Sequence, residues 1–127
     1  MRLFVVRHAE AAPGEPDALR PLTGEGRATA RALGEKLAAE RPDAVLCSPL
    51  LRARETAGPI ARAAGVQPEA DERLAPGAAA DGVRELVAGR GETIVVVGHQ
   101  PDCSEIVLAL SGREHQFAPG AVVEVEL

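Results

Sequence analysis

Four basic or titratable side chains stand where a phosphate pocket could form. Arg7 and His8 close one apolar run of the sequence, Arg52 comes shortly after a second run, and His99 follows a third. Arginine binds phosphate oxygens through paired hydrogen bonds, and a neutral imidazole can attack or donate a hydrogen bond near neutral pH. If they converge, these residues make a pocket for a phosphate group that needs no metal ion.

Their convergence depends on the elements that carry them. Residues 2–7, 43–47 and 93–97 are short apolar runs, and those at 2–7 and 93–97 are rich in β-branched residues. This pattern is typical of strands in a parallel sheet covered on both faces. Ligands of such sheets bind beyond the carboxyl ends of the strands, where the N-termini of helices also favour anions. We therefore expect Arg7, His8, Arg52 and His99 to meet at one edge of the sheet.

Helix signals alternate with the strand signals. We predict a helix capped by Thr23 that runs to about Glu40, and a second helix that starts at Ser48-Pro49, kinks or restarts at Gly58-Pro59 and ends at Gly65. The stretch 66–77 is ambiguous and is interpreted as a short strand followed by a loop. After it we predict a short helix capped by Asp81, a helix from Pro101 to Gly112, and a half-exposed edge strand at 123–127. This order predicts one α/β domain over residues 1–127, a three-layer fold with a mostly parallel central sheet, helices on both faces and little or no cap.

Composition excludes several other classes of function. The chain has 127 residues, a net charge of −5, two Phe and no Trp or Tyr, which argues against nucleic acids and anionic membranes as ligands. No stretch could span a bilayer, and the apolar run at 3–6 is too short for the core of a signal peptide, so we expect a cytoplasmic protein. Cys47 and Cys103 lie in apolar stretches and are interpreted as buried structural thiols.

Four motifs in the same order resemble the histidine phosphatase (phosphoglycerate mutase-like) superfamily. They are Arg7-His8-Ala9-Glu10, Leu22-Thr23 with Gly26, Ser48-Pro49-Leu50-Leu51-Arg52-Ala53-Arg54-Glu55-Thr56-Ala57, and Gly98-His99. Within the superfamily, the short length and Arg20-Pro21-Leu22-Thr23 resemble the SixA-type phosphohistidine phosphatases. The resemblance implies the phosphoglycerate mutase-like fold and a metal-independent phosphatase without a cofactor.

The resemblance also implies a role for each matching residue. His8 would be the nucleophile that becomes phosphohistidine, and Arg7 and Arg52 would bind the non-bridging phosphoryl oxygens. His99 would donate a hydrogen bond to the same oxygens, and Arg20 is a further candidate for phosphate binding. The implied partner is a phosphorylated protein, such as a histidine phosphotransfer domain, or a small phosphorylated metabolite. The sequence does not fix the oligomeric state, and a monomer is compatible with it.

The acid that protonates the leaving group is the one part of the family pattern without a clear match. Larger members of the family carry a glutamate where Ala75 or Pro76 stands here; Glu72 is the nearest candidate, and Asp17 and Asp102 are weaker ones. An imidazole leaving group tolerates a missing acid better than an alkoxide does. We therefore expect hydrolysis of phosphohistidine or a similar phosphoramidate. The alternatives are a broad or sugar-directed phosphomonoesterase and a domain that binds phosphate without turnover.

Overall fold

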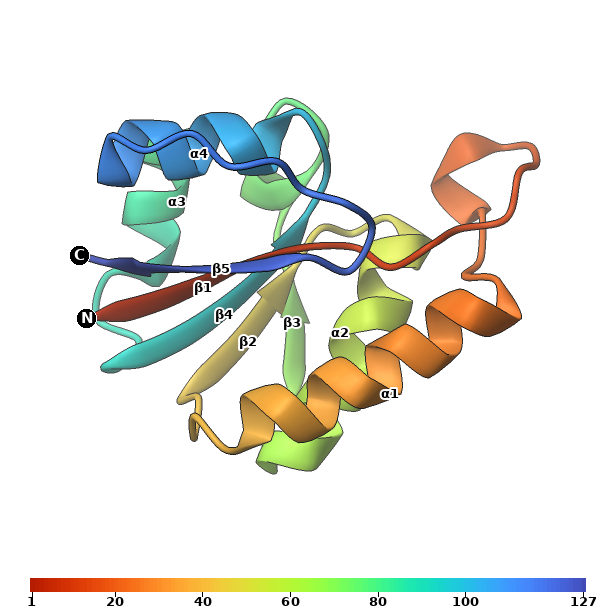
Figure 1. Ribbon diagram of the computed structural model, residues 1–127, viewed down its shortest axis with the longest axis horizontal. Helices are drawn as coiled ribbons and strands as arrows, with labels where there is room; N and C mark the ends of the chain where they lie inside the picture. Colours follow the sequence, from red (N-terminus) through yellow and green to blue (C-terminus); the bar gives the residue numbers. More distant parts are fainter.

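Five strands form a single sheet at the centre of the computed structural model, which describes residues 1–127 (Figure 1). The strands are β1 (Arg2–Arg7), β2 (Ala44–Cys47), β3 (Pro68–Ala70), β4 (Thr93–Gly98) and β5 (Val122–Glu126). They lie in the order β3-β2-β4-β1-β5, and only β5 is antiparallel to its neighbour. The prediction of a mostly parallel sheet with an edge strand at the end of the chain is thereby confirmed.

Four helices cover the two faces of the sheet. The helices α1 (Gly24–Ala38) and α2 (Leu51–Ala64) pack on one face, and α3 (Ala80–Val87) and α4 (Asp102–Ser111) pack on the other (Figure 1). Two 3-10 turns, η1 (Asp17–Leu19) and η2 (Glu72–Leu74), interrupt the loops that follow β1 and β3. The three-layer architecture predicted from the sequence is confirmed. No helix is both long enough and apolar enough to cross a membrane.

The strand sequences explain why the sheet has a core on each side. In β1, Leu3 and Val5 belong to the apolar cluster under α3 and α4, whereas Phe4 and Val6 belong to the cluster under α1 and α2. Successive side chains of a strand point to opposite faces, so a strand buried on both faces must be apolar throughout. The same reasoning applies to β4, where Thr93 to Val97 are all buried.

The helix α1 begins as predicted and packs closely on α2. The Thr23 hydroxyl accepts a hydrogen bond from the Gly26 amide at 3.0 Å, which caps the helix. At Gly34, a Cβ would lie 2.8 Å from the carbonyl oxygen of Pro59. The absence of a side chain at Gly34 therefore allows the two helices to come into backbone contact.

Three predicted helix features were wrong in detail. The second helix starts at Leu51 rather than at Ser48, because the Ser48 hydroxyl accepts from the Leu50 amide and contacts His99 instead of capping a helix. It also continues through Pro59 without a restart, where the close packing on Gly34 offsets the backbone hydrogen bond that proline cannot donate. Asp81 lies inside the first turn of α3, where the helix dipole favours a carboxylate, and Ala79 is the residue at the N-cap.

Candidate functional site

The carboxyl ends of β1, β2 and β4 bring the predicted site residues together. Val97 in β4 pairs with Val6 in β1 and with Cys47 in β2, so the residues that follow these positions share one edge of the sheet. The rings of His8 and His99 lie 5.2 Å apart between their centroids, with a tilt of 58°. The His8 amide donates to the Gly98 carbonyl at 3.0 Å, which fixes the nucleophile candidate against the end of β4.

His8 is held in one tautomer. Its Nδ1 lies 2.7 Å from the carbonyl oxygen of Ala9, and because a carbonyl can only accept, Nδ1 carries the proton. Burial is the largest cause that lowers the pKa of His8 below its usual value of 6.5, and the positive charges of Arg52, Arg7 and Arg20 lower it further. At neutral pH the ring is therefore neutral, and Nε2 keeps a free electron pair for attack.

His99 is buried and contacts Ser48, a residue that the sequence analysis used only as a helix start. The His99 Nε2 lies 2.8 Å from the Ser48 hydroxyl, and this hydroxyl also accepts from the Leu50 amide at 3.2 Å. Burial, followed by the nearby His8 and Arg52, lowers the pKa of His99 to about 4. When the Ser48 hydroxyl donates to Nε2, the neutral ring carries its proton on Nδ1, which is buried and has no protein partner.

Two arginines of the site come from different elements: Arg7 is the last residue of β1, and Arg52 is the second residue of α2. Arg7 donates from Nη1 to the Phe117 carbonyl at 2.8 Å, and its Nε is buried without a partner. Arg52 occupies the first turn of α2, and its side chain is only 8% exposed. The charge of Arg52 is compensated by Asp17, whose backbone carbonyl and carboxylate accept hydrogen bonds from Nη1 and Nη2 at 2.9 and 3.2 Å.

Asp17 joins the third arginine to the site. Its second carboxylate oxygen accepts from Arg20 Nη1 at 3.0 Å, and Arg20 Nε donates to the Ala12 carbonyl at 2.8 Å. These hydrogen bonds with Arg20 and Arg52 lower the pKa of Asp17 below its usual range, so the side chain is a carboxylate. Arg20, predicted as a phosphate ligand, thus lies near Arg52 through a shared anion that the sequence analysis had considered only as a weak acid candidate.

Thr56 supports both the His8 segment and Arg52. Its buried hydroxyl accepts from the Ala9 amide at 3.0 Å and donates to the Arg52 carbonyl at 2.8 Å. The threonine stands one helical turn after Arg52, so the pattern Arg-x-x-x-Thr on a helix predicts that the two share a face. Its bond to the loop after β1 could not be predicted, because that contact joins residues 47 positions apart.

None of the candidates for the acid is in place to protonate a leaving group. Glu72 is exposed in η2, and its carboxylate forms no hydrogen bond or ion pair with another residue. The nearby Leu74 carbonyl lies beside Gly98, 3.9 Å from where a Cβ would stand. Asp102 is buried and accepts from the amides of Gly77 and Ala78 at 2.8 and 3.2 Å, which anchors the loop after η2. Asp17 is ionised between its two arginines.

Other titratable groups do not contribute a second chemistry at this edge. Nowhere in the chain do three or more His, Cys, Asp or Glu side chains gather in a way that could hold a metal ion. Cys47 and Cys103 are both buried and unbridged. Burial raises the pKa of the Cys47 thiol to about 11 and that of Cys103 to about 12, so both are protonated and behave as apolar side chains.

Comparison with known proteins places this geometry in a family. The structure is similar to that of the protein histidine phosphatase SixA complexed with tungstate, with a TM-score of 0.88, 26% identity and coverage of 100% of this chain and 88% of that one. It is also similar to a candidate phosphohistidine phosphatase SixA from Agrobacterium tumefaciens, with a TM-score of 0.81, 28% identity and coverage of 97% and 89%. A mycobacterial glucosyl-3-phosphoglycerate phosphatase shares the fold, with a TM-score of 0.77 and coverage of 97% and 88%, at 19% identity.

Sequence comparison gives the same assignment. An uncharacterised protein of Picosynechococcus sp. is 35% identical over 121 residues, which cover 87% of this chain and 73% of that protein. Residues 3–76 match the family model of the histidine phosphatase superfamily (branch 1), a range that contains Arg7, His8 and Arg52. With the matched residues spanning more than half of the chain and the fold shared with SixA, this protein belongs to the histidine phosphatase superfamily.

Proposed function

We propose that this protein is a phosphohistidine phosphatase that transfers the phosphoryl group of its substrate to Nε2 of His8 and then hydrolyses the phosphoenzyme. The observation that carries the proposal is the hydrogen bond from His8 Nδ1 to the Ala9 carbonyl, beside Arg7, Arg52 and Arg20. It leaves an unprotonated Nε2 in a positive environment. A neutral imidazole among guanidinium groups is suited to attack a phosphorus atom whose oxygens these groups neutralise.

The first step needs no acid when the leaving group is an imidazole. The His8 Nε2 electron pair forms a bond to phosphorus while the phosphorus–nitrogen bond of the substrate breaks. A phosphohistidine protonated on its other ring nitrogen releases a neutral imidazole, which keeps that proton. An alkyl phosphate would instead release an alkoxide that requires a proton at once. The absence of a placed acid around His8 therefore favours a phosphoramidate substrate.

The second step returns the enzyme to its starting state. Water attacks phosphorus, the bond between phosphorus and His8 Nε2 breaks, and the electron pair of that bond returns to the ring. Nδ1 keeps its proton throughout, hydrogen-bonded to the Ala9 carbonyl. The oxygen and both hydrogens of the water leave with the phosphate as dihydrogen phosphate. Arg7 and Arg52 would stabilise the negative charge on the non-bridging oxygens in both steps, and a proton on His99 Nδ1 could supply a further hydrogen bond.

Three substrates test the proposal: a phosphorylated histidine phosphotransfer domain, para-nitrophenyl phosphate and a sugar phosphate. We expect turnover of the phosphorylated domain to exceed that of the two esters, and His8→Ala to abolish all activity. Rapid acid-free quenching of the wild type should trap a phosphorylated chain that mass spectrometry assigns to His8. Turnover that persists in His8→Ala, or a label on another residue, would overturn the mechanism.

A phosphomonoesterase is the second candidate, and it would require the Glu72 carboxylate to reach the site and act as the acid. This carboxylate is exposed on η2, whose Leu74 borders Gly98 at the edge of the site. If Glu72 serves as the acid for an ester substrate, Glu72→Gln should lower kcat for the sugar phosphate, whose alkoxide leaving group needs a proton, by at least tenfold. Under the phosphohistidine proposal, the same substitution leaves turnover of the phosphorylated domain unchanged.

A further inference from the structure

A groove between α1 and α2 concentrates positive charge in an acidic protein. A cavity of about 310 Å³ is lined by Arg27 and Arg31 from α1, and by Arg54 and Arg62 from α2. All four side chains are exposed. We call this surface the arginine groove. The chain as a whole carries a net charge of −5, so the groove differs sharply from the rest of the surface.

The charges of the arginine groove are not compensated within the chain. Ion pairs engage only five of the 14 basic side chains, namely Arg2, Arg20, Arg52, Arg73 and Arg90. Within the groove, Arg27 donates to the Leu22 carbonyl at 3.0 Å. Because this carbonyl is a neutral acceptor, the charge of Arg27 has no carboxylate partner. Glu55 is the one acidic side chain in the lining, and its Oε1 already accepts from the Leu22 amide at 2.8 Å.

The spacing of the arginines suits an extended acidic chain. Arg27 and Arg31 are four residues apart on α1, and Arg54 and Arg62 are eight apart on α2 with Gly58 between them. Four residues of helix rise about 6 Å. Alternate side chains of an extended peptide, which point the same way, are about 6.6 Å apart. Carboxylates at every second residue would therefore meet successive guanidinium groups.

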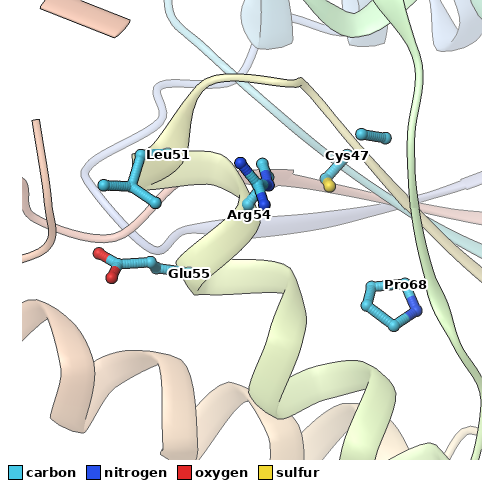
Figure 2. A pocket seen from close by; sticks show the side chains of 6 residues that line it. Cys47, Leu51, Arg54, Glu55 and Pro68 are labelled. Atoms are coloured by element: carbon cyan, nitrogen blue, oxygen red, sulfur yellow. The ribbon is translucent and has the colours of Figure 1, made fainter. Parts of the chain in front are cut away.

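The arginine groove continues towards the catalytic edge of the sheet. A second cavity, of about 420 Å³, shares Arg54 and Glu55 with it and is otherwise bounded by Leu51, Cys47, Pro68 and Ala70. In the close view, Arg54 stands between Cys47 and Glu55 (Figure 2). Cys47 ends β2 directly before Ser48, the partner of His99. A chain lying in both cavities would thus extend to the edge where His8 lies.

We propose that the arginine groove binds an extended acidic segment of the protein that carries the phosphoryl group to His8. The partner assignment rests on the proposed function, whereas the charge and shape of the groove do not. An acidic polypeptide is favoured over a single-stranded nucleic acid because sites for single strands combine a positive groove with exposed aromatic side chains on which the bases stack. The only two aromatic rings other than histidine, Phe4 and Phe117, are buried.

Direct binding tests the groove without any catalytic step. The probe is a fluorescent peptide of about 12 residues that alternates Glu and Ser, with a Gln/Ser peptide of equal length as reference; its alternate carboxylates match the spacing above. We expect Arg31→Ala/Arg62→Ala to weaken binding of the acidic peptide at least fivefold in fluorescence anisotropy. The matched control, Arg84→Ala/Arg113→Ala, removes two exposed arginines elsewhere and should bind like the wild type.

Three results would overturn the proposal that the arginine groove binds an acidic segment. They are no preference of the wild type for the Glu peptide, equal weakening of binding in the control variant, and tighter binding of a single-stranded oligonucleotide than of the Glu peptide. Neither Arg31 nor Arg62 contacts a residue of the catalytic edge, so both variants should hydrolyse a small phosphorylated substrate like the wild type. With a phosphorylated histidine phosphotransfer domain, we expect the groove variant alone to show a raised KM and an unchanged kcat.

The two proposals fail in different ways. If the wild type does not hydrolyse the phosphorylated domain, the proposed function is wrong, while selective loss of peptide binding in Arg31→Ala/Arg62→Ala still supports the groove as an acidic-segment site. If the phosphorylated domain is hydrolysed with the same KM by wild type and groove variant, the proposed function stands and the groove is not where this partner docks.

Discussion

At the scale of single residues, hydrogen bonds to the two histidines decide how each can act. The His8 proton is held on Nδ1 by the Ala9 carbonyl, and the His99 Nε2 is engaged by Ser48. A ring nitrogen that is engaged in this way leaves only the other nitrogen of the ring free for a further interaction. Ser48 thus belongs to the site as a positioning residue, although it need not contact phosphate.

Substitution of Ser48 tests this role. Ser48→Ala leaves the buried His99 Nε2 without a partner, so we expect a loss of about 1–3 kcal/mol in the free energy of unfolding. Urea denaturation followed by circular dichroism measures it, and turnover should fall together with stability because His99 is no longer held in one orientation. Thr29→Ala, at an exposed position of α1, serves as the control. A stability equal to that of the wild type would remove Ser48 from the site.

Asp17 is an anion that pairs with Arg52 and Arg20, the arginines proposed to bind phosphate, in the structure without a substrate. Because its carboxylate hydrogen-bonds Arg52 and Arg20, a phosphoryl group must compete with it or displace it. Its side chain is 62% exposed, so solvent screens the interaction and keeps it weak.

We expect Asp17→Asn to bind inorganic phosphate about two- to fivefold more tightly, in line with the loss of an exposed ion pair. Isothermal titration of phosphate into both proteins measures the change. Asp71→Asn removes a carboxylate that pairs with Arg73 outside the site and should leave the affinity unchanged. Weaker phosphate binding by Asp17→Asn would show that the carboxylate mainly holds Arg52 in position.

At the scale of the elements, contact between α1 and α2 sets where Arg52 stands. Gly34 faces the Pro59 carbonyl at a distance that no side chain allows, and Arg52 lies two turns before Pro59 on the same helix. A displacement of α2 would therefore move the arginine relative to β1 and β4.

Two glycine substitutions separate packing from helix propensity. Gly34→Ala should destabilise the protein by about 1–3 kcal/mol because the new methyl group overpacks the helix contact. Gly58→Ala, where the nearest atom to a Cβ is 3.5 Å away on the flexible Arg62 side chain, should instead stabilise it by up to about 1 kcal/mol. Thermal unfolding of the two variants should shift in opposite directions; equal shifts would contradict the close contact.

At the scale of the whole molecule, the buried histidines make stability depend on pH. The pKa of His99 falls from 6.5 to about 4 on folding, so between these values the unfolded chain binds a proton that the folded chain does not. The contribution of neutral His99 to the free energy of unfolding therefore rises with pH across this window and is fully present above pH 6.5. His8, whose pKa is also lowered, contributes in the same direction.

We expect the melting temperature to fall as the pH is lowered from about 6.5 to about 4, and His99→Gln to reduce this slope. The carboxylates do not mimic the effect, because Asp71, with a pKa of about 2, loses its contribution only below this window. Thr29→Ala, at an exposed position of α1, should keep the slope of the wild type. A melting temperature independent of pH across the window would show that His99 is not buried as a neutral ring.

The sequence alone determined the layered α/β fold and predicted the residues that the structure brings together at the carboxyl ends of the strands. Apolar periodicity, caps and strand ends are local patterns, so residues 2–7 and 93–97 and the motifs around His8 and Arg52 could be recognised without tertiary information. The predicted start of α2 and its predicted restart at Pro59 were wrong, because the contacts of Ser48 with His99 and of Pro59 with Gly34 outweighed local preference. The predicted cap of α3 was wrong by two residues, since Asp81 lies in the first turn.

Only the tertiary structure decided which side chains surround the predicted residues. Asp17 meets Arg52 across 35 positions of the chain, Thr56 meets Ala9 across 47 and Ser48 meets His99 across 51, and no local pattern encodes such contacts. The same holds for the arginine groove, which exists because α1 and α2 lie side by side. Residue types set what each group can do, and the packing of the sheet and helices sets which groups act together.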